Sequence, residues 1–257
     1  MKLLETIGVT KQFGKLLAVD NLDMSIESGE LRGLIGPNGS GKSTLFNLIS
    51  GFYGATSGKV IWQGHDITKK SPDKRTRMGI TRTFQANVLF QEQTAWQNVI
   101  VACHLHLGTN LWQQFLRGPG TVVKEKAIQK RALGLLESMD MADKADIVAN
   151  DLPHGYQRRL GIAIALATEP KLLMLDEPGA GLNTTEAVDL MDRVRKLNEA
   201  GITILLVEHN MRSIMSVCRK ITVINFGEKI AEGTPEEITQ NESVIEAYLG
   251  HRHSQNN

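Results

Sequence analysis

The chain has 257 residues, of which 41% are hydrophobic, so it is long enough for one large domain or for a core with a subdomain. Its 29 basic and 28 acidic residues nearly cancel, which argues against a nucleic-acid partner. No apolar run is long enough to span a bilayer, and the first residues contain no apolar secretory segment. Two isolated cysteines cannot form a disulfide framework, and we expect a cytosolic protein with reduced thiols.

The first part of the chain predicts short β-strands. Residues 3–35 contain strand-like alternation with turns at Gly14 and at Gly29, and residues 58–62 predict a further strand between turn residues. We therefore expect an antiparallel β region at the N-terminus.

A glycine-rich loop follows the apolar stretch 31–35 and precedes a predicted helix at 43–49. The loop fits the pattern G-x-x-x-x-G-K-[ST], and the alternative is an ordinary glycine-rich turn. A strand, loop and helix in this order point backbone N–H groups and a positive helix end at a polyphosphate. We expect Lys42 to reach the β- and γ-phosphates, Ser43 to offer its hydroxyl to Mg²⁺, and the loop to be surface-exposed. The predicted phosphate-binding residues are Gly36, Pro37, Asn38, Gly39, Ser40, Gly41, Lys42, Ser43 and Thr44.

The pattern changes to helical periodicity from about residue 94 to residue 168, which predicts an inserted helical subdomain. Within 124–139, the predicted apolar face carries Ala127, Ala132, Leu135, Leu136 and Met139. Gln85 ends a short predicted strand just before this block, where it could bind Mg²⁺ or water; the alternative is a surface glutamine.

Strands resume at 172–175, 202–207 and 221–224 and alternate with helices, which indicates a parallel sheet. Asp176 and Glu177 follow the first of these strands, and His209 follows the second. Ligands bind at the carboxyl edge of such sheets. We therefore expect Asp176 to hold Mg²⁺, Glu177 to act as general base, and His209 to contact the γ-phosphate and orient Glu177. The alternative for His209 is a purely structural role.

Together these motifs resemble the nucleotide-binding subunit of ABC transporters over about residues 3–250. The resemblance implies an α/β fold of the P-loop NTPase type, with an ABC ATPase core. It identifies the glycine-rich loop with the Walker A motif, the strand ending at Asp176 with Walker B, Gln85 with the Q-loop and His209 with the switch histidine. It also implies that Phe13, 23 residues before Gly36, stacks on adenine; simple core packing is the alternative.

The signature motif departs from the family form Leu-Ser-Gly-Gly-Gln. Residues 152–156 here read Leu-Pro-His-Gly-Tyr, so Gly155 remains while proline occupies the serine position. Gly155 and the following turn can still present N–H groups to the γ-phosphate bound by a partner subunit. Pro153 has neither a hydroxyl nor an N–H, which weakens this half-site. Asn183 stands where many members have aspartate.

These departures, and the ending at residues 245–250, resemble the ATPases of branched-chain amino-acid importers. The resemblance implies one ABC ATPase domain over 1–250, a flexible tail at 251–257, and the cofactors ATP and Mg²⁺. It also implies two transmembrane permease subunits, a second ATPase subunit in a heterodimer or a homodimer, and, indirectly, a solute-binding protein. The protein would be cytoplasmic and peripheral on the inner face of the membrane. The alternatives are a urea or amide importer, a lipopolysaccharide exporter, a soluble ABC ATPase, or a nucleotide-binding regulator that hydrolyses little ATP.

Overall fold

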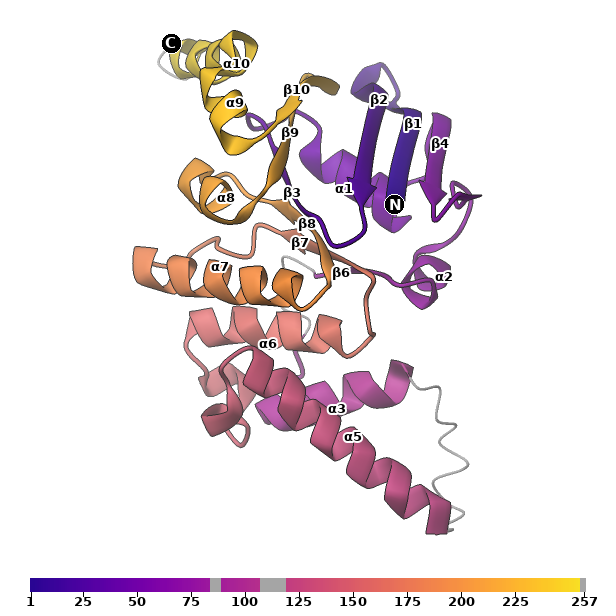
Figure 1. The fold of residues 1–257 in the computed structure, drawn as a ribbon, viewed down its shortest axis with the longest axis vertical. Coiled ribbons are helices and arrows are strands. Elements are labelled where there is room, and N and C mark those ends of the chain that lie inside the picture. The colour runs from indigo at the N-terminus through magenta and orange to yellow at the C-terminus, as the bar shows by residue number, and fades with distance from the viewer. Residues whose placement is uncertain (84–88, 107–118, 255–257) are drawn as a thin grey trace. The chain divides into compact units, whose positions relative to one another are not determined.

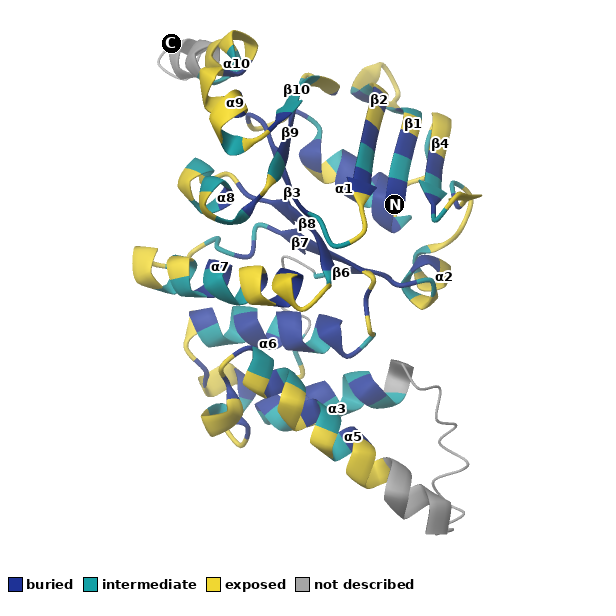
Figure 2. Ribbon diagram, viewed as in Figure 1, coloured by how far each residue is buried: buried dark blue, intermediate teal, exposed yellow. Residues whose placement is uncertain are grey.

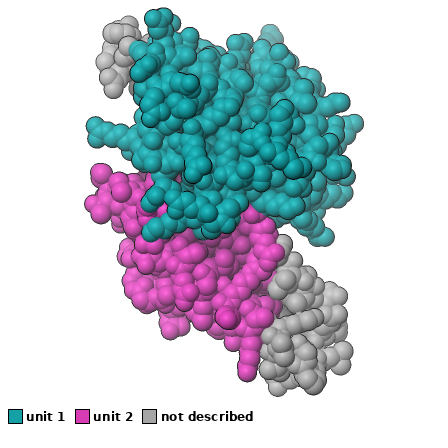
Figure 3. Space-filling model, viewed as in Figure 1, with its two compact units in different colours: residues 1–82, 171–177, 194–257 teal, residues 83–170, 178–193 magenta. Residues whose placement is uncertain are grey.

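The chain folds into two compact units, each built from separate stretches of sequence (Figure 3). The computed structural model describes residues 1–83, 89–106 and 119–254. The first unit contains residues 1–82, 171–177 and 194–257, and the second contains residues 83–170 and 178–193. Both β-sheets belong to the first unit.

A four-stranded sheet, ordered β2-β1-β4-β5, forms the N-terminal part of the first unit (Figure 1). Strands β1 (Lys2–Phe13) and β2 (Leu16–Glu27) make an antiparallel hairpin, and β4 (Ser57–Trp62) and β5 (His65–Asp66) extend it. The expected antiparallel region is confirmed, although its first two strands are 12 residues long rather than short. Alternating burial along β2 explains the alternation in its sequence.

The second sheet has six strands in the order β10-β9-β3-β8-β7-β6. Strands β6 (Ile80–Arg82), β7 (Leu172–Asp176), β8 (Thr203–Val207), β3 (Leu31–Ile35) and β9 (Lys220–Asn225) are parallel, and β10 (Glu228–Gly233) pairs antiparallel with β9. Every residue of β3, β7 and β8 is buried, which accounts for their largely apolar sequences, with Arg32 of β3 as a buried exception.

Helix α1 (Lys42–Ser50) packs into a core that both sheets share. Leu45, Phe46 and Leu48 of this helix are buried together with Val19 of β2 and Met174 of β7. Figure 2 shows α1 largely in the colour of buried residues. The burial of its apolar face holds the helix, and hence the loop before it, in one position relative to the strand ends.

Four further helices belong to the first unit. They are α2 (Pro72–Arg77), α8 (Met211–Val217), α9 (Pro235–Gln240) and α10 (Glu242–Ser254). The tail predicted at 251–257 begins inside α10, and residues 255–257 lie outside the described residues, so its flexibility stays a prediction. Among the described residues, no helix combines the length and the apolar character that crossing a bilayer requires.

The second unit is helical. Helices α3 (Ala95–His106), α5 (Pro119–Ser138) and α6 (His154–Leu166) pack on one another, with 3₁₀ turns at Ala142–Lys144 and Ala149–Asp151. Helix α7 (Thr184–Glu199) begins in this unit and ends in the first. The range 94–168 falls within this unit, and its role as a subdomain inserted in one ATPase domain stays a prediction.

The buried face of α5 differs by one position from the expected one. Ala132, Leu136 and Met139 are buried, but Ala127 is exposed and Ile128 is buried instead. The expectation for Ala127 was wrong because 128, not 127, continues the spacing of four from 132 and 136.

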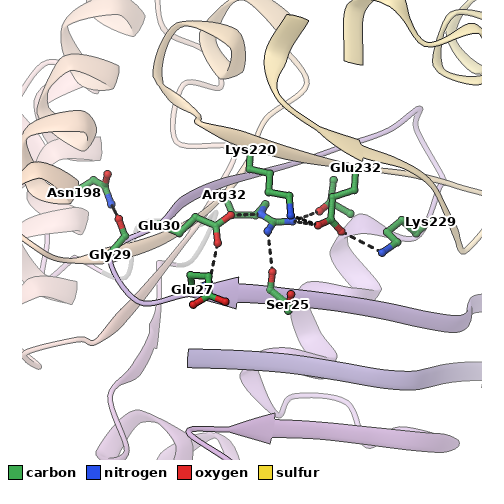
Figure 4. A network of polar contacts seen from close by, with 10 residues as sticks. Ser25, Glu27, Gly29, Glu30, Arg32, Asn198, Lys220, Lys229 and Glu232 are labelled. Carbon is green, nitrogen blue, oxygen red and sulfur yellow. Dashed lines mark hydrogen bonds and ion pairs between the residues drawn. The ribbon is translucent and has the colours of Figure 1, made fainter. Parts of the chain in front are cut away.

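A polar network joins both sheets around Arg32 of β3, which is 1% exposed (Figure 4). Its Nε atom lies 2.5 Å from Oε1 of Glu30, and its Nη2 donates to the main-chain oxygen of Ser25 on β2 at 2.8 Å. Its Nη1 lies 3.2 Å from Oε1 of Glu232 on β10, which also pairs with Lys220 at 2.5 Å. A buried charge requires such pairing, and the network ties β2 and β10 to the strand that precedes the glycine-rich loop.

Candidate functional site

Two glycines of the loop between β3 and α1 are required by close packing. A Cβ on Gly36 would lie 2.0 Å from the main-chain oxygen of Ile224, and one on Gly41 would lie 2.4 Å from that of Ala18. Gly41 is also the N-cap of α1, has a φ of 105°, and provides no side-chain hydrogen bond to the helix. The N–H groups of the first turn of α1 are therefore left for an anion.

Lys42 hydrogen-bonds to the loop that precedes it. Its Nζ donates to the main-chain oxygens of Gly36 at 2.8 Å and Pro37 at 2.9 Å, and the residue is 7% exposed. Burial lowers the pKa of Lys42, and the charges of Glu177 and Asp176 oppose that change. The loop is not surface-exposed as expected: of residues 36–44 only Asn38, Gly39 and Ser43 are exposed, because the carbonyls of Gly36 and Pro37 turn inward to bind the ammonium group.

Asp176 ends β7 with its side chain 2% exposed. Its Oδ2 pairs with Arg82, whereas Oδ1 is buried without a hydrogen-bond partner among the described residues. Burial raises the pKa of Asp176, the Arg82 guanidinium opposes the change, and the Glu177 carboxylate reinforces it. The orphaned Oδ1 of Asp176 and the exposed hydroxyl of Ser43 are oxygen ligands of the kind that Mg²⁺ takes, one or two from the protein, when phosphates supply others.

Glu177 has a backbone conformation that is unusual for a non-glycine residue. Its φ is 47°, and its N–H donates to the main-chain oxygen of Val207 on β8 at 2.8 Å. Strain of this kind costs of order 1–3 kcal/mol and is often found at functional sites. The bend turns the chain at the end of β7, and the Glu177 side chain is 30% exposed.

His209 lies beside Glu177. Its Nδ1 is 3.6 Å from Oε2 of Glu177, and its side chain is 59% exposed. The two residues reach the same edge of the sheet because β7 and β8 are adjacent and parallel. The next residue, Asn210, caps α8 through its side-chain oxygen, which accepts from the N–H of Arg212 at 3.0 Å.

Phe13 is at the tip of the β1–β2 hairpin, opposite Leu16. The hairpin continues to Ala18, whose main-chain oxygen packs against Gly41 of the loop. The Phe13 ring is 41% exposed and makes an edge contact with Tyr53, with ring centroids 5.3 Å apart. A residue this exposed is not packed in the core, and the stacking of Phe13 on adenine stays a prediction.

The remaining predicted residues lie elsewhere. Gln85 lies outside the described residues. Gly155 is buried in the second unit, in the first turn of α6, whose N-cap Pro153 makes no side-chain hydrogen bond. The first backbone bonds of α6 run from Tyr156 and Gln157 to Pro153, so the amides of His154 and Gly155 precede them.

The chain is similar in sequence to a known protein family. Residues 19–180 match the family model described as "ABC transporter". The chain is 43% identical to the high-affinity branched-chain amino acid transport ATP-binding protein BraF of Pseudomonas aeruginosa, over 96% of this chain and 98% of that protein. It is 41% identical to the LivG protein of the same description from Escherichia coli (strain K12), with the same coverage.

This chain belongs to the ABC transporter family.

The fold agrees with that assignment. A solved ABC transporter cassette in its ADP conformation has a TM-score of 0.84 and 32% identity, covering 97% of this chain and 99% of that one. A dimeric cassette bound to ADP and Pi has a TM-score of 0.73 and 28% identity, covering 91% and 99%. The protein is therefore an ATP-binding ATPase of this family, and the predicted P-loop α/β fold is confirmed.

The C-terminal part of this ABC ATPase matches a second family model. Residues 228–254 match "Branched-chain amino acid ATP-binding cassette transporter", and they comprise β10, α9 and α10. Tyr248 of α10 lies near the loop: burial raises the pKa of its phenol, and the main-chain N–H of Gly36 partly offsets that effect.

Sequence reasoning did not identify three features of this ABC ATPase. They are the contact of Tyr248 with the loop, the strained backbone of Glu177, and the contacts of Arg82 with Asp176 and Asn47. A charged residue at the end of the strand-like stretch 80–82 was the available signal for Arg82. Nothing in the local sequence indicated the other two.

Proposed function

We propose that this ABC ATPase is the ATP-binding subunit of an importer for branched-chain amino acids or a related small polar solute. The observation that carries the proposal is the near full-length identity to BraF and LivG, at 43% and 41%, together with the branched-chain model over residues 228–254. The C-terminal match matters because it covers a region outside the general ABC model.

ATP binds with its adenine on Phe13 and its phosphates on the loop from Gly36 to Thr44. Lys42 leaves the carbonyls of Gly36 and Pro37 and moves its charge to the β- and γ-phosphates, which offer a stronger, charge-assisted partner. Ser43 and the free Oδ1 of Asp176 hold Mg²⁺, which neutralises phosphate charge when bound.

Glu177 is the general base for the attacking water, and His209 orients it and contacts the γ-phosphate. The 3.6 Å separation of their side chains supports a shared role, since one water between them is within reach of both. Gln85 completes the metal and water contacts in this proposal.

A second ATPase subunit supplies the opposing signature loop. The dimeric form of a solved neighbour supports a dimer, and the replacement of the signature serine by Pro153 favours a heterodimer whose other member has a complete signature. The first-turn amides of α6, including that of Gly155, supply the remaining attraction for the partner's γ-phosphate.

Two permease subunits couple this ATPase to transport, and a solute-binding protein delivers the solute to them. Phe90 is a candidate docking residue because its side chain is 56% exposed while its backbone is fixed. The amide side chain of Asn98 accepts from the N–H of Phe90 at 2.8 Å and donates to its main-chain oxygen at 3.1 Å. An exposed ring on a fixed backbone is unlike a side chain that anchors a core.

In this proposal the protein acts in the cytoplasm, peripherally on the inner face of the membrane, and binds no nucleic acid. A urea or amide importer and a lipopolysaccharide exporter are the alternatives within the same family.

The test is solute uptake by cells that lack the gene, complemented with the wild-type chain or with Glu177→Gln. We expect loss of leucine, isoleucine and valine uptake, restored by the wild type alone. Normal uptake of all three in the deletion strain, with loss of urea uptake, would contradict the proposal and favour the alternative importer.

A further inference from the structure

Arg82 connects two elements of the nucleotide site. It ends β6, and its side chain is 13% exposed. Its Nη2 lies 3.0 Å from Oδ2 of Asp176 at the end of β7, and its Nη1 donates to Oδ1 of Asn47 on α1. The guanidinium carbon lies 5.0 Å from the ring centroid of Phe46 and 5.7 Å from that of Phe52. Two hydrogen-bonding arms and two aromatic contacts leave this guanidinium little rotational freedom.

Two hydrogen-bond partners of Arg82 are a proposed magnesium ligand, Asp176, and a residue one helical turn from another, Asn47. Asn47 follows Ser43 by one helical turn, so both project from the same face of α1. Asp176 is itself a proposed ligand, and its two oxygens are in different environments. Oδ2 pairs with Arg82, and Oδ1 is buried without a partner among the described residues. Arg82 therefore holds one oxygen and leaves the other for a cation.

We propose that Arg82 is a positioning residue for the magnesium site, which holds the Asp176 carboxylate at a set distance from the Ser43 face of α1. The inference rests on the proposed function of Asp176 and Ser43. Removal of a group that hydrogen-bonds to a metal ligand and orients it typically lowers metal affinity or activity by about 10- to 100-fold. The planar fork of arginine suits this task because it bonds to Asn47 and Asp176 at once, which the single ammonium of lysine cannot do with the same geometry.

Charge repulsion between Arg82 and the cation would change magnesium affinity in the opposite direction. Arg82 carries a positive charge close to the cation site, and charge repulsion alone would weaken magnesium binding. Removal of Arg82 would then tighten magnesium binding, whereas loss of positioning would weaken it. The sign of the change therefore separates the two effects.

The test compares Arg82→Met with Arg77→Met, which removes the same charge from an exposed position on α2. Calorimetry measures the affinity for a non-hydrolysable ATP analogue in EDTA and in Mg²⁺, and electron paramagnetic resonance measures Mn²⁺ binding to the analogue complex. We expect Arg82→Met to reduce the metal-dependent gain in affinity and the Mn²⁺ affinity by about tenfold or more, with metal-free affinity within about twofold of wild type. Arg77→Met should match the wild type.

An unchanged or larger metal-dependent gain in Arg82→Met overturns the proposal, as does an equal loss of affinity without metal, which would indicate general damage to the loop. If Arg82→Met fails to fold, Asn47→Ala decides the question. This variant keeps the ion pair between Arg82 and Asp176 and removes the hydrogen bond from Arg82 to α1, so it should lower the Mn²⁺ affinity. An unchanged Mn²⁺ affinity overturns the proposal. Asp176→Asn tests the site itself: if it keeps the full metal-dependent gain, the magnesium assignment fails rather than the role of Arg82.

Discussion

His209 Nδ1 lies 3.6 Å from Glu177 Oε2, although 31 residues separate the two in the sequence (209 − 177 − 1). The pair forms because β7 and β8 are adjacent parallel strands and both end at the same edge of the sheet. The backbone of Glu177 has a positive φ of 47° at this point. The separation is longer than a hydrogen bond, so both groups can hydrogen-bond to the same water instead of to each other.

Glu177→Gln should retain ATP binding and slow hydrolysis by roughly 100-fold or more, a typical contribution of a general base. Glutamine preserves the shape of the side chain but cannot accept the proton. Phosphate release and calorimetric ATP affinity provide the measurement, with the exposed Glu199→Gln as control. Near wild-type turnover in Glu177→Gln would exclude the role.

Lys42→Ala should weaken ATP binding by about tenfold or more, since a charge-assisted bond contributes about 1.5–3 kcal/mol. Because Lys42 is 7% exposed and bonds to two loop carbonyls, the variant should also unfold at a lower temperature without nucleotide. Calorimetry and thermal denaturation measure the two effects, and Lys59→Ala, at an exposed position, is the control. Unchanged nucleotide affinity would remove Lys42 from the site.

Phe90→Asp should uncouple transport from ATP hydrolysis while leaving the unfolding temperature close to wild type, because the ring is 56% exposed. Asn98→Ala is the contrasting variant. Asn98 is 1% exposed and bonds to the backbone around Phe90, so its loss should cost about 1–3 kcal/mol of stability. Uptake and ATPase rates in reconstituted vesicles, together with thermal denaturation, separate these effects. A large drop in unfolding temperature for Phe90→Asp would favour an anchoring role instead.

The Glu232 network predicts a pH dependence of stability. Burial alone would raise the pKa of Glu232, but the hydrogen bond from Lys220, the charge of Arg32 and the contacts of Lys229 together lower it from 4.5 to about 2. A carboxyl group with a lowered folded-state pKa stabilises the fold above about 4.5, and this contribution is lost as the pH falls towards about 2. The stability difference between the wild type and Glu232→Gln should therefore be large at pH 7 and shrink below about pH 4.5.

Denaturant unfolding at several pH values measures that difference. Glu228→Gln, at an exposed position on β10, is the control and should differ little from wild type at any pH. A pH-independent difference for Glu232→Gln would show that its charge does not stabilise the fold.

The double substitution Pro153→Ser with His154→Gly brings four of the five signature positions to the family form, leaving Tyr156, and should increase ATP-driven dimerisation of the chain alone. The serine can also cap α6, which now has no side-chain cap, and such caps contribute about 0.5–2 kcal/mol. Analytical ultracentrifugation with ATP in the Glu177→Gln background measures the association. If the chain with its own signature already forms a tight homodimer in that background, and the substitution changes nothing, the signature does not limit self-association.

Much of the site could be predicted because its interactions are local. The strand, glycine loop and helix from Leu31 to Ser50 are consecutive, and the close contacts at Gly36 and Gly41 require the glycines that form the motif. The buried strands β7 and β8 were predictable for a similar reason, since continuous apolar runs ending in polar residues are typical of parallel sheets.

Other features depended on contacts between distant segments. The contact of Tyr248 with the loop could not be predicted from neighbouring residues. Arg82 shows this most clearly: its partners are on α1 and β7, 35 and 94 residues away. The sequence by itself determined which chemical groups stand at each strand end and in the loop, because backbone periodicity and local sterics act over a few residues. Only the tertiary structure decided which of those groups meet, because strand order and side-chain packing depend on the free energy of the whole core.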